Sequence, residues 1–187
     1  MSTYLHILRE VGIFQDLDEE RLKRVAGICQ ERTYEMGTLI FAENTASQEL
    51  YVIAQGAVDI QVDPAILGIE REGLPGPTTI TTLQRGQVFG EVALADEGLR
   101  SASARCASKT ARLLVISRED LIRLCEEDSW LGYLVMRNVA AELALKIRHT
   151  DLMVREQLLW RPRFERKTAS QESAQNKAAM GGKSDED

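Results

Sequence analysis

The chain has 187 residues, of which 44% are hydrophobic and 28% are charged. These values suit one soluble globular domain with an appendage. The formal net charge of −6 argues against general affinity for nucleic acid or anionic membranes. Any bound anion would therefore need a local site.

Cysteine usage and the N-terminal sequence bear on the cell compartment. Cys29, Cys106 and Cys125 stand far apart and form no CxxC pair. An odd number of cysteines makes no disulfide framework, which indicates a reducing, cytoplasmic setting. The opening MSTYLHILREVG lacks a long apolar run, so we expect no signal peptide. The sequence also lacks the run of about 18 apolar residues that a membrane span needs.

Residues 1–30 are predicted to form N-terminal helices, because apolar residues recur there at helical spacing. Asp16 or Asp18 is a suitable N-cap, since Glu19 and Glu20 follow in the next turn.

The pattern changes to β-type runs over residues 31–116. These runs lie at about 33–62, 78–88 and 102–116 and are separated by turn residues. Short strands at close spacing predict an antiparallel barrel or roll. The Gly- and Pro-rich insertion around 62–78 is expected to be a long, mobile hairpin loop.

Four glycines in this region stand at expected turns: Gly37, Gly56, Gly86 and Gly90. We expect each to adopt a positive φ, which favours glycine.

Residues 117–160 are predicted to form C-terminal helices, the second running over about 128–160. At 1.5 Å per residue it would be about 45–50 Å long, more than a lid on such a roll needs. Its length and apolar stripe predict a homodimer through this helix. Asn138 and Arg148 intrude on one possible dimer register, and Trp130 is expected to anchor the helix in the core. The remainder, 161–187, has almost no large apolar residue and is predicted to be a disordered tail.

The segment FGEVALADEGLRSASAR places Glu91 nine positions before Arg100, among small residues. The turn at Gly90 can present backbone N–H groups to an anion. The guanidinium of Arg100 can bind two oxygens of one phosphate, and the amides of Ser101 and Ala102 can donate to the same group. Glu91 is a hydroxyl acceptor. Together they indicate a site for a small phosphorylated sugar.

This segment resembles the phosphate-binding cassette of the cyclic-nucleotide-binding domain family, which includes the catabolite activator protein and protein kinase A regulatory subunits. Three further stretches are similar to family motifs in the same order: GTLIFAENTASQELYVIAQGAVDI, RGQVFGE and RLLVISREDLIRL. The resemblance covers about residues 14–155. It implies a mainly β fold, an eight-stranded antiparallel jelly-roll-like β-roll flanked by N-terminal helices and a long C-terminal helix.

By this resemblance, Glu91 would bind the ribose 2′-OH of a cyclic nucleotide. Arg100, Ser101 and Ala102 would hold the cyclic phosphate. In the family a hydroxyl residue at the position of Ser101 tolerates guanine as well as adenine, which leaves cGMP open. The sequence has no dedicated guanine-reading residue, so cAMP is favoured over cGMP as the ligand.

The resemblance gives three more residues local roles. Gly90 and Val92 would shape the cassette. Thr150, in KIRHTD, would contact the base as in catabolite-activator-like members; the alternative is a solvated helical threonine.

An enzyme is one alternative, because cupin rolls of related appearance bind metals through clustered histidines and carboxylates. This chain has only His6 and His149, both on predicted helices, and no nucleophile, metalloprotease or Walker motif. We therefore expect no catalysis, no metal and no cofactor beyond the nucleotide ligand.

A DNA-binding regulator is another alternative. The sequence after Trp160 is too short and too polar for a helix-turn-helix, so we expect no direct DNA binding. The interpretation is a cyclic-nucleotide sensor with no effector domain on the chain, acting on an unidentified downstream protein. The remaining alternative is a degenerate roll that serves only as an interaction or dimerisation module.

Overall fold

The computed structural model describes residues 4–46, 48–63, 76–95 and 98–160. The chain divides into two compact units, Met1–Leu143 and Ala144–Asp187. Most of the 62–78 insertion (64–75) and the whole predicted tail (161–187) lie outside the described residues.

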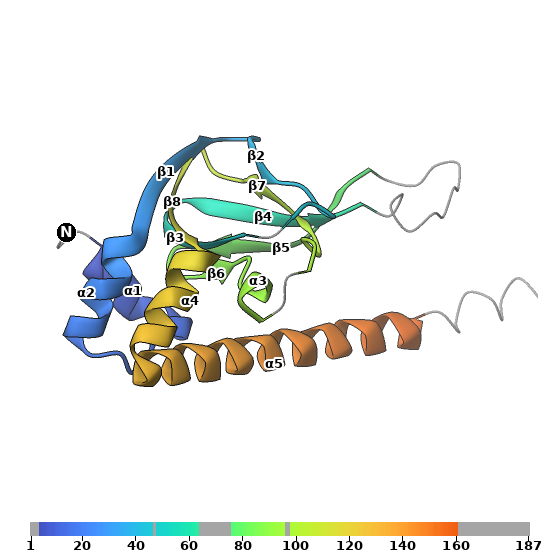
Figure 1. Cartoon of the computed structure of the whole chain (residues 1–187). Helices are drawn as coiled ribbons and strands as arrows, with labels where there is room; N and C mark the ends of the chain where they lie inside the picture. The colour runs from blue at the N-terminus through green and yellow to red at the C-terminus, as the bar shows by residue number, and fades with distance from the viewer. Residues whose placement is uncertain (1–3, 47, 64–75, 96–97, 161–187) are drawn as a thin grey trace, which may run out of the picture. The chain divides into compact units, whose positions relative to one another are not determined.

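The described residues contain eight strands and a set of flanking helices (Figure 1). The strands are β1 (Cys29–Glu35), β2 (Leu39–Phe41), β3 (Glu49–Gln55), β4 (Ala57–Val62), β5 (Thr78–Gln84), β6 (Val88–Phe89), β7 (Ser103–Cys106) and β8 (Thr110–Ser117). The helices are α1 (Leu5–Glu10), the 3-10 helix η1 (Gly12–Phe14), α2 (Glu19–Ile28), α3 (Val92–Ala95), α4 (Arg118–Glu127) and α5 (Ser129–Trp160).

The strands form two four-stranded sheets, in the orders β1-β8-β3-β6 and β2-β7-β4-β5. Every pairing between these strands is antiparallel. This confirms the predicted fold class, a mainly β, eight-stranded antiparallel roll with flanking helices. The predicted positive φ is also confirmed at all four turn glycines.

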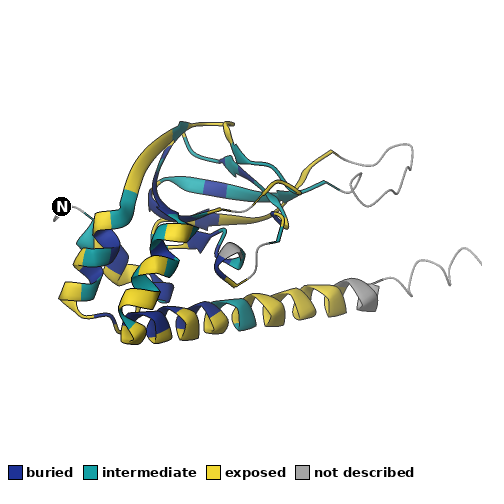
Figure 2. Ribbon diagram, in the orientation of Figure 1, coloured by how far each residue is buried: buried dark blue, intermediate teal, exposed yellow. Residues whose placement is uncertain are grey.

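Strands β3 and β8 of the first sheet are buried on both faces. Side chains alternate in direction along a strand, so neighbouring residues enter different cores. In β8, Leu113 and Val115 join a core cluster inside the roll, whereas Leu114 and Ile116 join a second cluster with the helices. The consecutive buried residues of β3 and β8 follow from this arrangement (Figure 2). The β-roll and the helices are therefore stabilised by the same strands.

The N-terminal helices begin as the sequence predicts, and Asp18 is the N-cap of α2. Its carboxylate accepts a hydrogen bond of 2.9 Å from the backbone N–H of Arg21. The predicted helical range extends slightly too far, since α2 ends at Ile28 and Cys29 already begins β1.

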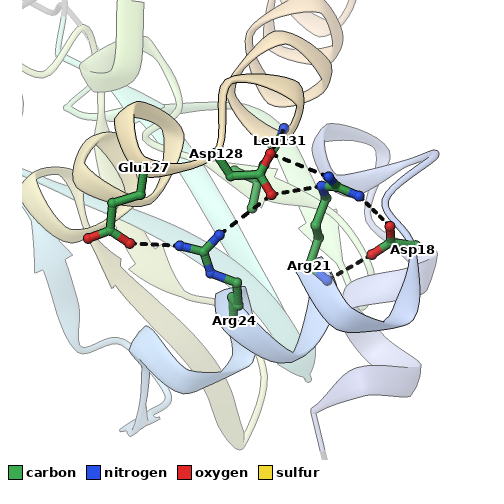
Figure 3. Close-up of polar contacts among 6 residues, drawn as sticks. All are labelled: Asp18, Arg21, Arg24, Glu127, Asp128 and Leu131. Atoms are coloured by element: carbon green, nitrogen blue, oxygen red, sulfur yellow. Dashed lines mark hydrogen bonds and ion pairs between the residues drawn. The ribbon is translucent and has the colours of Figure 1, made fainter.

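An ion-pair network joins α2 to the junction between α4 and α5 (Figure 3). The carboxylate of Asp128 accepts hydrogen bonds from the backbone N–H of Leu131 at 3.0 Å and from Nε of Arg21 at 2.9 Å. These bonds hold the pKa of Asp128 below its usual value. Arg24 pairs with Glu127 at 2.7 Å in the same network. The start of α5 is thus fixed to the N-terminal helices.

Two expectations about α5 are wrong. Trp130 is 56% exposed and stacks on Tyr133 with ring centroids 5.3 Å apart, because the helix turns Leu131 and Leu134 to the core instead. Asn138 does not interrupt an exposed register; it is only 8% exposed. Its amide donates hydrogen bonds to the backbone carbonyl oxygens of Ile13 (3.3 Å) and Gln15 (2.8 Å).

The buried amide of Asn138 generates a stability prediction. Asn138→Ala leaves two carbonyl oxygens without their donor, so we expect the free energy of unfolding to fall by about 1–3 kcal/mol. Chemical denaturation monitored by circular dichroism measures the change. Met136→Ala, on the exposed face of the same helix, is the control and should change stability by less than about 0.5 kcal/mol. Equal effects of the two substitutions would contradict the role of Asn138.

Candidate functional site

The candidate site lies where β6 leaves the first sheet. The chain turns at Gly90 and Glu91, forms the single-turn helix α3, and returns through residues 98–102 into β7. Glu91 is 2% exposed and Arg100 is 5% exposed, so both charged residues of the predicted cassette are buried. Charged side chains are rarely buried to this extent unless they are bound by partners.

The partners of Arg100 come from two strands, β2 and β3, and from the turn at Gly90. Its Nη2 donates to the backbone carbonyl oxygen of Glu49 at 2.8 Å, and Nη1 lies 3.5 Å from that of Gly90. The guanidinium carbon lies 4.1 Å from the ring centre of Phe41, a cation–π contact. The planar guanidinium, a fork of N–H donors, is therefore held on its face by the Phe41 ring and on one edge by the carbonyl oxygens.

Part of the guanidinium remains without a protein partner. The buried Nε of Arg100 has no hydrogen-bond partner among the described residues. Burial lowers the pKa of Arg100 from its ordinary value, while the neighbouring Tyr51, Glu49 and Glu91 act in the opposite direction. An arginine remains protonated under such a shift. The arrangement is a buried cation with donor capacity to spare, which suits an anion.

Position 90 requires a glycine, both for its backbone conformation and for the lack of space around it. Its φ is +78°, and a Cβ built there would lie 2.4 Å from Nη1 of Arg100 and 2.9 Å from the carbonyl oxygen of Glu49. Any side chain would therefore displace the guanidinium as well as strain the turn.

Three aromatic rings support the site, although no sequence pattern predicts a role for any of them. Phe41, Tyr51 and Phe89 have ring centroids 4.9–5.8 Å apart, with Tyr51 and Phe89 stacked at 8°. Phe89 immediately precedes the cassette. The family motifs contain all three residues, but only the fold reveals that they meet.

Glu49 forms a second polar group beside the rings. Its carboxylate accepts hydrogen bonds from the hydroxyl of Tyr51 and from both terminal nitrogens of Arg32, at 2.7 and 3.2 Å. Partial burial raises the pKa of Glu49, but these bonds outweigh it and hold the pKa below its usual value. Burial and the bond to Glu49 raise the pKa of Tyr51. The carboxylate thus stays ionised and fixes the Tyr51 hydroxyl.

The other predicted site residues fall into two groups. Val92 and Ala102 are partly buried and Ser101 is exposed, all on the cassette with Glu91 and Arg100. Thr150 is exposed and lies in the other compact unit, where its hydroxyl donates to the carbonyl oxygen of Lys146 at 3.0 Å. The roles of all these residues toward a ligand stay predictions.

The sequence profile of the "Cyclic nucleotide-binding domain" matches residues 31–128, more than half of the chain. The chain belongs to the cyclic nucleotide-binding domain family. This confirms the resemblance found in the sequence. This family consists of regulatory domains, and the buried Glu91 and Arg100 described above both lie within the matched residues.

Relatives of this cyclic nucleotide-binding domain include a bacterial receptor and a eukaryotic kinase. The cyclic AMP receptor protein of Thermus thermophilus is 36% identical over 140 residues, covering 75% of this chain and 59% of that protein. Human cGMP-dependent protein kinase 2 is 30% identical over 116 residues, covering 62% of this chain and 14% of the kinase. The chain therefore spans less than two thirds of either relative.

A solved structure supports the same assignment. The crystal structure of Thermus thermophilus catabolite activator protein matches with a TM-score of 0.64 at 32% identity, covering 78% of this chain and 62% of that chain.

The described residues contain neither a metal-binding cluster nor a membrane-spanning helix. No group of three or more His, Cys, Asp or Glu side chains there could hold a metal ion. No helix in that part of the chain is both long and apolar enough to cross a membrane.

Gly90 generates a prediction about the cassette. Gly90→Ala introduces a Cβ into the space of the Arg100 guanidinium and strains a positive φ, so we expect a loss of about 1–3 kcal/mol in the free energy of unfolding. Gly27→Ala is a matched control, because Gly27 lies in α2 with nothing within 4 Å of its built Cβ. It should stabilise the protein by about 0.5–1 kcal/mol. Denaturation curves of both variants check the prediction, which requires that the two changes in the free energy of unfolding have opposite signs.

Proposed function

We propose that this domain binds a cyclic nucleotide, cAMP in preference to cGMP, and acts as the sensor of a regulatory protein. One observation carries the proposal: Arg100 is 5% exposed in the family's cassette, and its Nε has no hydrogen-bond partner among the described residues. A buried cation with unused donors is costly, and a bound phosphate would offset that cost.

The cassette residues receive the following roles in this proposal. Arg100 binds the cyclic phosphate as a planar fork, and the amides of Ser101 and Ala102 donate to the same group. Glu91 accepts from the ribose 2′-OH, since the oxygens of a carboxylate are hydrogen-bond acceptors. Gly90 keeps the space in which the guanidinium lies.

The remaining assignments concern Val92, Thr150 and the choice of nucleotide. Val92 shapes the cassette from the first turn of α3. Thr150 is assigned to the base by resemblance alone. The preference for cAMP is supported by the higher identity to the cyclic AMP receptor protein, 36%, than to the cGMP-dependent kinase, 30%. A cytoplasmic location and the absence of catalysis and of direct DNA binding remain part of the proposal.

Binding would act on the helices by shifting a population between two conformations. Such a shift can be no larger than the difference in ligand affinity between them. The connection from the cassette to the helices is short, because β8 passes directly into α4 at Ser117.

Removal of the guanidinium fork tests the proposal. Calorimetric titration with cAMP and with cGMP should give saturable binding to the wild-type protein, tighter for cAMP. Arg100→Gln should weaken the affinity at least about 30-fold, because the phosphate would lose its buried cationic partner. Arg85→Ala, an arginine on the same roll with a half-exposed side chain paired to Glu10, is the control and should bind as wild type. The absence of binding to either nucleotide by the wild-type protein would refute the sensing function and favour the interaction module.

We also propose a homodimer through α5. Tyr133, Ala140, Ile147 and Val154 recur every seven residues, and the three large ones are 54%, 63% and 48% exposed. An apolar stripe with this repeat is the pattern of a coiled-coil seam.

A charged substitution in this apolar stripe of α5 tests the dimer. Ile147→Glu should convert the protein to a monomer, because two like charges would face each other across a two-fold interface. Leu145→Glu, which is 57% exposed but lies outside the seven-residue repeat, should leave the dimer intact. Sedimentation equilibrium measures both. A monomeric wild-type protein, or equal dissociation by both substitutions, would contradict the seam.

A further inference from the structure

Phe41 contacts the centre of the candidate site from the opposite sheet. It is the last residue of β2, and its ring centre lies 4.1 Å from the guanidinium carbon of Arg100. The same ring packs on Tyr51 and Phe89 at 5.6 and 5.8 Å. The attraction between a guanidinium and an aromatic face strengthens with desolvation, and here Arg100 is 5% exposed and Phe41 is partly buried. The ring therefore fixes the plane of the fork.

The turn that follows β2 holds the backbone of the same arginine. The N–H of Asn44 donates to the carbonyl oxygen of Arg100 at 2.9 Å, and the N–H of Arg100 donates to that of Thr45 at 2.9 Å. An isolated antiparallel bridge joins Ala46 to Leu99. Both backbone groups of Arg100 are thus bonded to one turn.

Asn44 gives this turn its shape. Its φ is +61°, in the left-handed region that asparagine tolerates and β-branched residues avoid. The turn is further closed by the hydroxyl of Thr45, which donates to the carbonyl oxygen of Ala42 at 2.6 Å. A residue unable to adopt this conformation at position 44 would move both hydrogen bonds to Arg100.

We propose that Phe41 and Asn44 are positioning residues that orient the Arg100 fork for the anionic group of the ligand. Phe41 fixes the guanidinium plane and Asn44 fixes the backbone from which it extends. This inference rests on the proposed function, in which that anionic group is the cyclic phosphate. Pre-organisation of this kind raises affinity because less rotamer freedom is lost on binding.

Phe41 is tested by two substitutions and a matched control, with cAMP as the probe. Phe41→Leu removes the cation–π contact and should weaken binding about tenfold, whereas Phe41→Tyr keeps the ring face and should bind within about twofold of wild type. Phe14→Leu is the control, because Phe14 is 1% exposed in the helix-side core cluster, whereas Phe41 packs against the other cluster. It should lower thermal stability without changing the affinity. If both leucine variants change affinity in proportion to their loss of stability, the positioning role is refuted.

Asn44 is tested in the same titration. Asn44→Gly keeps access to positive φ and should bind within about twofold of wild type, whereas Asn44→Val strains the turn and should weaken binding about tenfold. Equal affinities for the glycine and valine variants would overturn the role of Asn44.

A readout that needs no ligand separates this inference from the proposed function. The Arg100 Nε–H proton is buried and lies close to the ring of Phe41, so its NMR resonance carries a ring-current shift; Arg100→Lys identifies the signal. The resonance should move in Phe41→Leu and in Asn44→Val but not in Phe14→Leu. If the wild-type protein binds neither nucleotide, the sensing function fails and this resonance alone decides the positioning role. An unmoved resonance would refute it.

Discussion

The burial of a cationic guanidinium is the constraint on which the rest of this site depends. Arg100 is 5% exposed, and a desolvated charge is costly unless the fold supplies partners. Those partners are the carbonyl oxygen of Glu49 on β3, the carbonyl oxygen of Gly90 after β6, and the ring of Phe41 on β2. The first two segments belong to one sheet and the third to the other. The arginine is therefore held only when both sheets have formed.

The position of the cassette follows from the alternation of side chains along two short paired strands. In the pairing of β6 with β3, Phe89 lies opposite Tyr51 and Val88 opposite Val52. Phe89 and Tyr51 point into the roll, whereas Val88 and Val52 join the core cluster of the helices. A one-residue shift of register would reverse both sets. The turn at Gly90 is thus fixed by two separate cores, which explains how a two-residue strand can hold a loop with buried charges.

The sequence was sufficient for features determined by local chemistry. The positive φ of Gly90, the N-cap at Asp18 and the β-type runs each depend on one residue or on a short repeat, and each is confirmed. The contacts of Phe41 depend on three segments meeting in space, and a motif gives the residue type without its neighbours. The sequence therefore indicated that Arg100 is important but not what supports it.

Helix α5 illustrates why burial is harder to predict than secondary structure. Its apolar residues occur on more than one face, so helical spacing alone does not identify the side that packs on the core. The sequence placed Asn138 in a possible dimer register and Trp130 in the core, whereas Asn138 is buried and Trp130 is exposed. The two free carbonyl oxygens of the turn around η1 require a donor, and the Asn138 amide satisfies them. Because α-helices have 3.6 residues per turn, a helix that points Asn138 inward points Tyr133 outward, and Tyr133 is 54% exposed. The buried amide, together with the core contacts of Leu131 and Leu134, thereby determines which face of the helix is left for a partner.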